Sequence, residues 1–217
     1  MMLAGLILLL LPSCMTLGVG LEGTQREYGL KGATKESFAH CAGHGCVRRK
    51  MIGLNEAEWS RISEAFASGA QGEDAAAERE RIRHAIAEME KIVGQKTGTH
   101  RDVGGSFAGT GRPGQMDCVD EMSNVATYLT IFIDEGLIQQ HRLGRRYTNH
   151  IFKTSWWPHT ATSIVQKDNG QEFIVDSWWL KNGSLPYIVT LEEWSEGEWD
   201  RPMTGKTKRE VEATMDL

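Results

Sequence analysis

Cys118 is the residue whose type and position most strongly suggest chemistry. It follows the Gly- and Pro-containing segment "GRPGQMD" and begins a periodic apolar stretch that predicts a helix over residues 118–135, ended by Gly136. Asp117 is the expected N-cap, and Asp120 completes a capping box three residues later. Free N–H groups and the dipole at a helix start favour an anion, and the thiolate is the form of cysteine that attacks carbonyls. Cys118 is therefore a candidate nucleophile, with a small core residue as the alternative.

Two residues on neighbouring predicted strands supply the partners that a cysteine nucleophile needs. Such a nucleophile requires a histidine that accepts and returns its proton, and a third group that orients the histidine. His159 opens the predicted strand "HTATSIVQ" and Asp176 closes the predicted strand "EFIVD", with an Asn-Gly hairpin turn between them. Pairing about that turn places His159 and Asp176 near the same end of a sheet. The simpler alternatives are that His159 caps its strand and that Asp176 begins a turn.

Other residues near these three are candidates for supporting roles. The Gln115 side chain and the backbone N–H of Cys118 are candidate oxyanion donors. Trp157 and Trp178 flank His159 and Asp176 in the sequence and are candidates for lining a substrate groove, with core packing as the alternative.

The amino-terminal segment has the features of an export signal. Its first eleven residues, "MMLAGLILLLL", are apolar and too short to span a membrane. The "LPS" that precedes Cys14 resembles a bacterial lipobox, so residues 1–13 are expected to be a signal peptide of lipoprotein type, with Cys14 as the lipidation site. A cleaved signal without lipid and an N-terminal strand are the alternatives. Residues 14–37, rich in Gly and Thr, are expected to form a tether.

Export places the chain in an oxidising compartment, where cysteines tend to pair. Cys41 and Cys46, in "HCAGHGC", are close enough to form a local disulfide. The alternative is a zinc site built from His40, Cys41, His44 and Cys46, although four ligands within seven residues would surround one ion poorly. With Cys14 lipidated and Cys41 paired with Cys46, Cys118 remains as an unpaired thiol.

The hydrophobic pattern predicts an α+β fold for residues 38–217, taken as one domain. Residues 55–69 and 73–94 have helical periodicity, and the period changes from 3.6 to 2 after residue 136. The net charge is −5, with acidic and basic residues interspersed, so the pattern argues against nucleic acid as a partner.

The order and spacing of Cys118, His159 and Asp176 resemble the bacterial transglutaminase-like cysteine proteinases, a branch of the papain-like superfamily. The family segment Gly-Asp-Cys-x-Asp is matched by Asp117, Cys118 and Asp120, with Met116 where a Gly is common. His159, followed by Thr160 and Ala161, matches the family histidine at a strand start, and Asp176 matches the aspartate that ends the next strand. The similarity covers residues 111–180, about a third of the chain.

This resemblance implies a papain/transglutaminase-like core, with the Cys-bearing helix packed on an antiparallel sheet, and a cysteine peptidase or amidase with a Cys118–His159–Asp176 triad. It predicts a protein or peptide substrate, no obligatory cofactor, and a possible calcium site at Asp117 and Asp120. Together with the lipobox it predicts a periplasmic protein held at a membrane by its lipid. The competing hypothesis is a non-enzymatic lipoprotein, a binding or assembly module that keeps this fold.

Overall fold

The structure, a computed structural model, describes residues 17–20, 31–105, 111–149 and 158–196. These residues form a mixed fold with four α-helices and two antiparallel sheets, which confirms the predicted α+β class. Two parts of the sequence prediction, the signal peptide (residues 1–13) and the lipidation site at Cys14, lie outside the described residues, as does Trp157.

The predicted order of helices first and sheet afterwards is wrong at its start, because three short strands precede the first helix. In chain order the elements are β1 (Leu17–Gly20), β2 (Phe38–Ala42), β3 (Arg48–Ile52), α2 (Glu56–Ser68), α3 (Ala75–Thr97), the 3-10 turn η1 (Thr99–Arg101), α4 (Cys118–Asp134), β4 (His141–Asn149), β5 (His159–Gln166), β6 (Glu172–Asp176), β7 (Tyr187–Thr190) and α5 (Leu191–Glu196).

The larger sheet has the strand order β1-β4-β5-β6-β7, and every neighbouring pair is antiparallel. Strands β5 and β6 form the predicted hairpin about Asn169 and Gly170, with Thr162 opposite Val175. This register places His159, at the start of β5, near Asp176, at the end of β6. The smaller sheet is the β2–β3 hairpin, in which His40 lies opposite Lys50.

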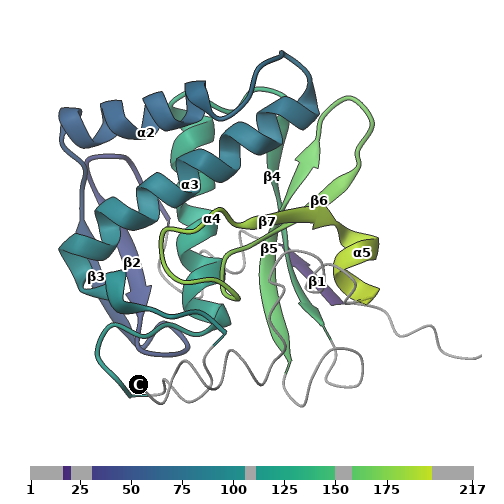
Figure 1. Cartoon of the computed structure of the whole chain (residues 1–217). Coiled ribbons are helices and arrows are strands. Elements are labelled where there is room, and N and C mark those ends of the chain that lie inside the picture. Colours follow the sequence, from purple (N-terminus) through teal and green to yellow (C-terminus); the bar gives the residue numbers. More distant parts are fainter. Residues whose placement is uncertain (1–16, 21–30, 106–110, 150–157, 197–217) are drawn as a thin grey trace, which may run out of the picture.

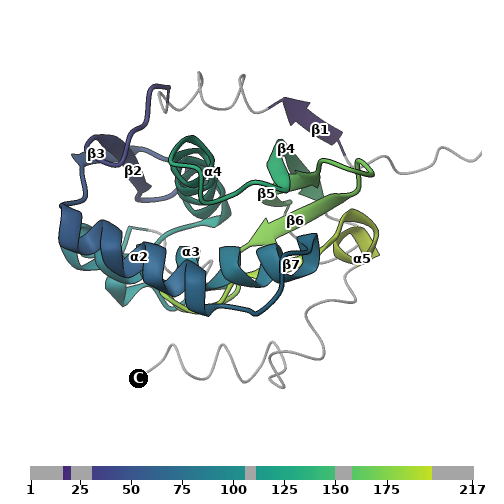
Figure 2. The same ribbon diagram turned by 90° about the horizontal axis from the view of Figure 1, so that it is seen from above.

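Helix α4 is the central element of the fold. It lies between the β2–β3 hairpin and the five-stranded sheet, and α2 and α3 cover one side of this arrangement (Figures 1 and 2). Most residues of α4 are buried, among them Val125, Leu129 and Phe132, which join one core with residues of α3 and of the sheet. Burial on several faces fixes the helix that carries Cys118 in both position and rotation.

Polar side chains cap the starts of the helices. Asn55 caps α2 in a capping box with Glu58, and Asp74 caps α3 by accepting the N–H of Ala77. Helix α3 ends at Gly98, whose φ of 91° is in the left-handed region that favours glycine.

One part of the predicted tether belongs to the folded body. Leu17–Gly20 forms strand β1 on the outer side of β4, with Leu17 opposite Thr148. A strand this short pairs through main-chain groups, which leave no periodic signal in the side chains. In the described ranges, no helix combines the length and apolarity that crossing a bilayer requires.

The β2–β3 hairpin is closed by the predicted disulfide between Cys41 and Cys46, both of which are buried. The turn inside the disulfide has four consecutive residues with positive φ, from Gly43 to Cys46. His44 and Cys46 adopt this conformation without being glycines, which is uncommon and requires support from the surroundings.

Loss of the disulfide is expected to destabilise the fold. Replacing Cys41 and Cys46 by Ser should lower the free energy of unfolding by about 2 kcal/mol, because the crosslink restricts the unfolded chain. Urea denaturation followed by tryptophan fluorescence measures this change, and Cys118→Ser provides a matched control with an unpaired cysteine. An unchanged midpoint in the double variant would show that the crosslink contributes nothing to stability.

Candidate functional site

Cys118 occupies the first position of α4 and is the one free cysteine of the described residues, with 8% of its surface exposed. The Asp117 carboxylate caps the N–H groups of Val119 and Asp120, as the sequence predicts. The N–H of Cys118 itself is not among the groups that Asp117 caps. The thiol therefore lies at the positive end of a helix dipole, beside an uncapped N–H donor.

The disulfide turn holds the start of α4 through main-chain N–H groups. His44 N–H and Cys46 N–H donate to the two carboxylate oxygens of Asp120, each at 2.7 Å, and Gly45 N–H donates to Asp117 at 2.9 Å. Consecutive N–H groups in such a turn form a concave anion-binding nest. The positive φ values of the turn are thus supported by two carboxylates from the helix that carries Cys118.

This arrangement gives the two aspartates a positioning role in place of metal binding. Both carboxylate oxygens of Asp117 and both of Asp120 accept hydrogen bonds from main-chain N–H groups. These oxygens therefore already have hydrogen-bond donors in the positions that a cation would need. Across the described ranges, no group of three or more His, Cys, Asp or Glu residues has the geometry to hold a metal ion. The zinc alternative also loses Cys41 and Cys46, because they form a disulfide.

A second loop holds the segment before Cys118. Asp102 accepts the N–H of Met116 at 2.9 Å. Gly104, with a φ of 72°, lies so close to Leu180 that a Cβ would come within 2.2 Å of the Leu180 carbonyl oxygen. The loop therefore ties the approach to α4 to the segment that follows β6.

His159 and Asp176 make the predicted contact. Nε2 of His159 lies 2.5 Å from an Asp176 carboxylate oxygen, and each residue is only 2% exposed. The same oxygen accepts the indole N–H of Trp194 at 2.9 Å, and the other accepts the main-chain N–H of Trp178 at 3.3 Å. Several donors therefore fix the carboxylate, which in turn fixes the orientation of the imidazole.

Three tryptophans surround the imidazole. The ring centroids of Trp178, Trp179 and Trp194 lie 5.0, 5.2 and 5.7 Å from that of His159. Trp178 was a candidate for lining a substrate groove. It is only 1% exposed and packs against His159, which agrees with the alternative of core packing. Trp194, on the short helix α5, is a site residue that sequence reasoning missed.

The surroundings of His159 favour its charged form. Burial lowers the pKa of the imidazole, but the Asp176 carboxylate and the Cys118 sulfur raise it more, to about 9. Nδ1, the nitrogen that does not face Asp176, is buried and has no hydrogen-bond partner among the described residues. His159 therefore contacts Asp176 directly, the Cys118 sulfur acts on its pKa, and Nδ1 remains available for a proton transfer.

Gln115 has a different partner from the one expected of an oxyanion donor. Its side-chain nitrogen donates to the Arg101 carbonyl at 2.7 Å, which holds it against η1. Its role in the oxyanion hole stays a prediction, and the uncapped N–H of Cys118 is the better placed candidate.

Three carboxyl groups that sequence reasoning missed are buried beside this site. Glu90 on α3, Asp102 after η1 and Glu121 on α4 are each 2–3% exposed. Burial raises the pKa of Glu121 well above its usual range, and the charges of Glu90, Asp102, Asp120 and Asp176 raise it further. The carboxyl of Glu121, one turn after Cys118, is therefore shifted towards its neutral form.

The other two buried carboxyls titrate near neutrality. Burial raises the pKa of Glu90 to about 7, although the Gly183 N–H opposes the shift. Burial also raises the pKa of Asp102 to about 6, opposed by its hydrogen bond from Met116. Glu90 lies four residues after Ile86 and three before Val93, which places it on the apolar face of its helix. This spacing was the sequence signal that could have predicted its burial.

Comparison of the chain with protein-family models, with curated proteins and with solved structures finds no match.

The raised pKa of His159 can be measured directly. We expect its imidazole to titrate with a midpoint near 9, and Asp176→Asn to lower this midpoint to about 6.5 or below, since burial then dominates. Because the folded state holds the proton more tightly, the stability from this pair is complete below about pH 6.5 and is lost as pH rises through about 9. NMR of the ring nitrogens measures both midpoints. A midpoint near 6.5 in the unaltered protein would contradict this account of the site.

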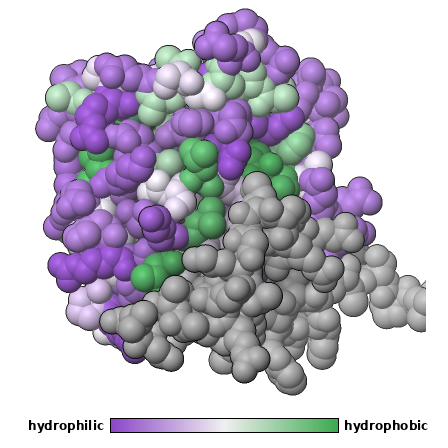
Figure 3. All heavy atoms as spheres, in the orientation of Figure 1, coloured by the Kyte–Doolittle hydropathy of each residue, from purple (hydrophilic) through white to green (hydrophobic). Residues whose placement is uncertain are grey.

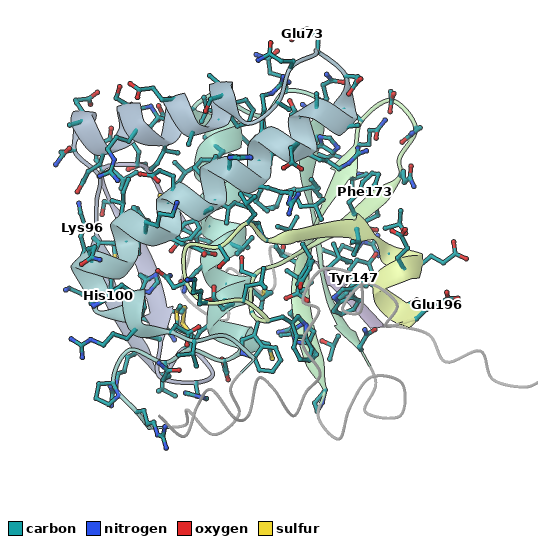
Figure 4. All side chains as sticks on the ribbon, in the orientation of Figure 1. Glu73, Lys96, His100, Tyr147, Phe173 and Glu196 are labelled. Atoms are coloured by element: carbon teal, nitrogen blue, oxygen red, sulfur yellow. A yellow bond between two sulfur atoms is a disulfide. The ribbon has the colours of Figure 1, made fainter. Side chains whose placement is uncertain are left out.

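Glu121→Gln tests the buried carboxyl cluster. A raised carboxyl pKa costs stability as pH rises, so the amide should increase the free energy of unfolding by more than about 1 kcal/mol at about pH 8 and by less at about pH 4. Urea denaturation at both pH values measures the difference, with the exposed Glu73→Gln as the matched control (Figure 4). Equal effects at the two pH values would mean that Glu121 is not held neutral by burial.

Proposed function

We propose that this protein is a cysteine hydrolase, a peptidase or amidase, that uses Cys118, His159 and Asp176 as a catalytic triad. The observation that carries the proposal is the buried His159–Asp176 pair at 2.5 Å, with a second imidazole nitrogen left available and a pKa that the Cys118 sulfur helps to raise. A histidine that served only as packing would not need an orienting carboxylate and a thiol as its two neighbours.

In the proposed amide hydrolysis each residue has a separate role. The Cys118 thiol gives its proton to His159, and the resulting thiolate attacks the carbonyl carbon. The electron pair of the C=O bond moves to the carbonyl oxygen, where the Cys118 N–H can donate to it. His159, protonated at neutral pH, gives its proton to the leaving amine as the C–N bond breaks, which leaves a thioester on Cys118. His159 then takes a proton from water as the water attacks the thioester, and the C–S bond breaks. Asp176 keeps Nε2 of His159 directed away from the sulfur throughout.

The rest of the proposal concerns fold family and location. We take the helix α4, which starts at the nucleophile and packs on an antiparallel sheet bearing the histidine and aspartate, as a papain/transglutaminase-like core. The lipobox-like segment before Cys14 supports a place in the bacterial cell envelope, with the protein anchored to a membrane by lipid and acting on protein or peptide substrates.

An activated ester tests the chemistry without knowledge of the substrate. p-Nitrophenyl acetate should acetylate Cys118 with a burst of p-nitrophenolate, followed by slower turnover, because thioester formation and hydrolysis are separate steps. Intact-mass spectrometry should show the acetyl group on the protein, and Cys118→Ser should abolish it. His159→Ala should slow acylation by about 100-fold or more, the usual contribution of a positioned acid–base group.

A surface histidine provides the control for this experiment. His84→Gln removes an imidazole on α3 whose side chain is 38% exposed, and it should leave the burst unchanged. Acetylation that persists in Cys118→Ser, or a His159→Ala protein as fast as the unaltered one, would sink the triad proposal and favour the non-enzymatic module.

A further inference from the structure

A cavity lies next to the start of α4. It is a cavity of about 190 Å³ between the β2–β3 hairpin, the C-terminal end of α3 with η1, and residues 112–115. His40, Thr99 and Gln115 are its buried lining residues. In Figure 4, Lys96 and His100 mark the end of α3 and the turn after it, and Thr97 and Thr99 between them line the cavity. Neither Cys118 nor His159 lines it, so it is distinct from the proposed triad.

Positive charge is concentrated around this cavity. Its lining includes Arg48, Arg49, Lys50 and Arg112 and contains no Asp or Glu. The register of the hairpin places Lys50 opposite His40 and Arg48 opposite Ala42, so these two cations share the face of β2 and β3 that bounds the cavity. Arg112 comes from the far side, because it belongs to the loop before α4. Segments distant in sequence thus assemble a basic site in a chain whose net charge is −5.

No acidic partner compensates these four cations among the described residues. In the described residues, none of the four forms an ion pair with a carboxylate, whereas Lys96 pairs with Glu58 and Arg61 with Glu88. Lys50 donates to the main-chain carbonyl of Lys96, which leaves its charge uncompensated. Hydrophilic side chains cover much of the face of the molecule that Figure 3 shows.

The interior of the cavity adds polar groups and no negative charge. Burial, followed by the charge of Lys50, lowers the pKa of His40 to about 3, so its ring is neutral. The ring lies 3.2 Å from the Tyr128 hydroxyl and 3.3 Å from the Thr99 hydroxyl, which fixes its position. A pocket for a whole drug-sized ligand usually has about 300–1,000 Å³. The cavity is therefore suited to one charged group and not to a large molecule.

We propose that this cavity binds an oxyanion, a carboxylate or phosphate group, through Arg48, Lys50 and Arg112. Arginine is suited to this task because its planar guanidinium donates two parallel N–H groups to such an anion. Gln115 lines the cavity, and the chain runs from it through two residues to Cys118. A bound anion therefore lies on the side of the nucleophile helix where the disulfide turn is attached. The proposal goes beyond the hydrolase function and does not depend on it.

Titration of the full chain with two simple anions tests this site. Inorganic phosphate and N-acetyl-L-glutamate are added at constant ionic strength, and binding is followed by calorimetry and by NMR shifts of the Thr99 and Gln115 amides. We expect saturable binding of at least one anion. The anion that binds more tightly identifies the group as phosphate or carboxylate. Arg48→Gln combined with Arg112→Gln should weaken binding by at least about tenfold, because charge-assisted hydrogen bonds are lost.

A second double variant controls for the change in net charge. Arg142→Gln with Lys167→Gln removes two exposed cations, one in β4 and one just after β5, and should leave the affinity unchanged. Absence of saturable binding for both anions, or equal weakening in the two double variants, would overturn the proposal. Because the assay measures binding alone, Cys118→Ser protein should give the same affinity, and an inactive triad would leave this result intact.

Discussion

The attachment of the disulfide turn to the start of α4 is the interaction on which the arrangement of the site depends. Asp117 and Asp120 accept three N–H groups from the turn while they cap the helix that begins at Cys118. One pair of carboxylates thereby stabilises a strained turn, caps the N-terminus of the central helix and sets the position of the thiol. Removal of the Asp120 carboxylate would leave the buried N–H of Cys46 without its partner, which costs about 1–3 kcal/mol.

Burial of charge is the second constraint on this molecule. His159 gains more from Asp176 and Cys118 than it loses by burial, so it keeps its proton. Burial and the like charges of neighbouring carboxyl groups raise the pKa of Glu121 and favour its neutral form. The two shifts are consistent because, in a poorly hydrated interior, the sign of the neighbouring charges decides which form is favoured. A neutral Glu121 also avoids a further negative charge beside the Cys118 sulfur.

Sequence reasoning predicted the features that local patterns determine. Capping residues marked the starts of the helices at Asn55 and Asp117, and the Asn-Gly turn fixed the hairpin that brings His159 to Asp176. The short spacing of Cys41 and Cys46 was sufficient to predict their disulfide.

The remaining features depend on contacts between distant segments, which spacing does not encode. The indole of Trp194 reaches Asp176 across 18 positions, and the main chain of the disulfide turn reaches Asp120 across more than 70. The burial of Trp178 and the basic cavity formed with Arg112 also arise only when separate elements pack together. The two aspartates illustrate the limit, because the sequence predicted their capping role and gave no signal of the turn that they bind.

The rate at which iodoacetamide alkylates Cys118 in the folded protein tests the central claim most directly. If His159 activates the sulfur, labelling at neutral pH should exceed that of free cysteine although the thiol is 8% exposed, and His159→Ala should slow it at least about tenfold relative to His84→Gln. A protected thiol, or a labelling rate that does not depend on His159, would contradict the account and leave Cys118 as a packing residue.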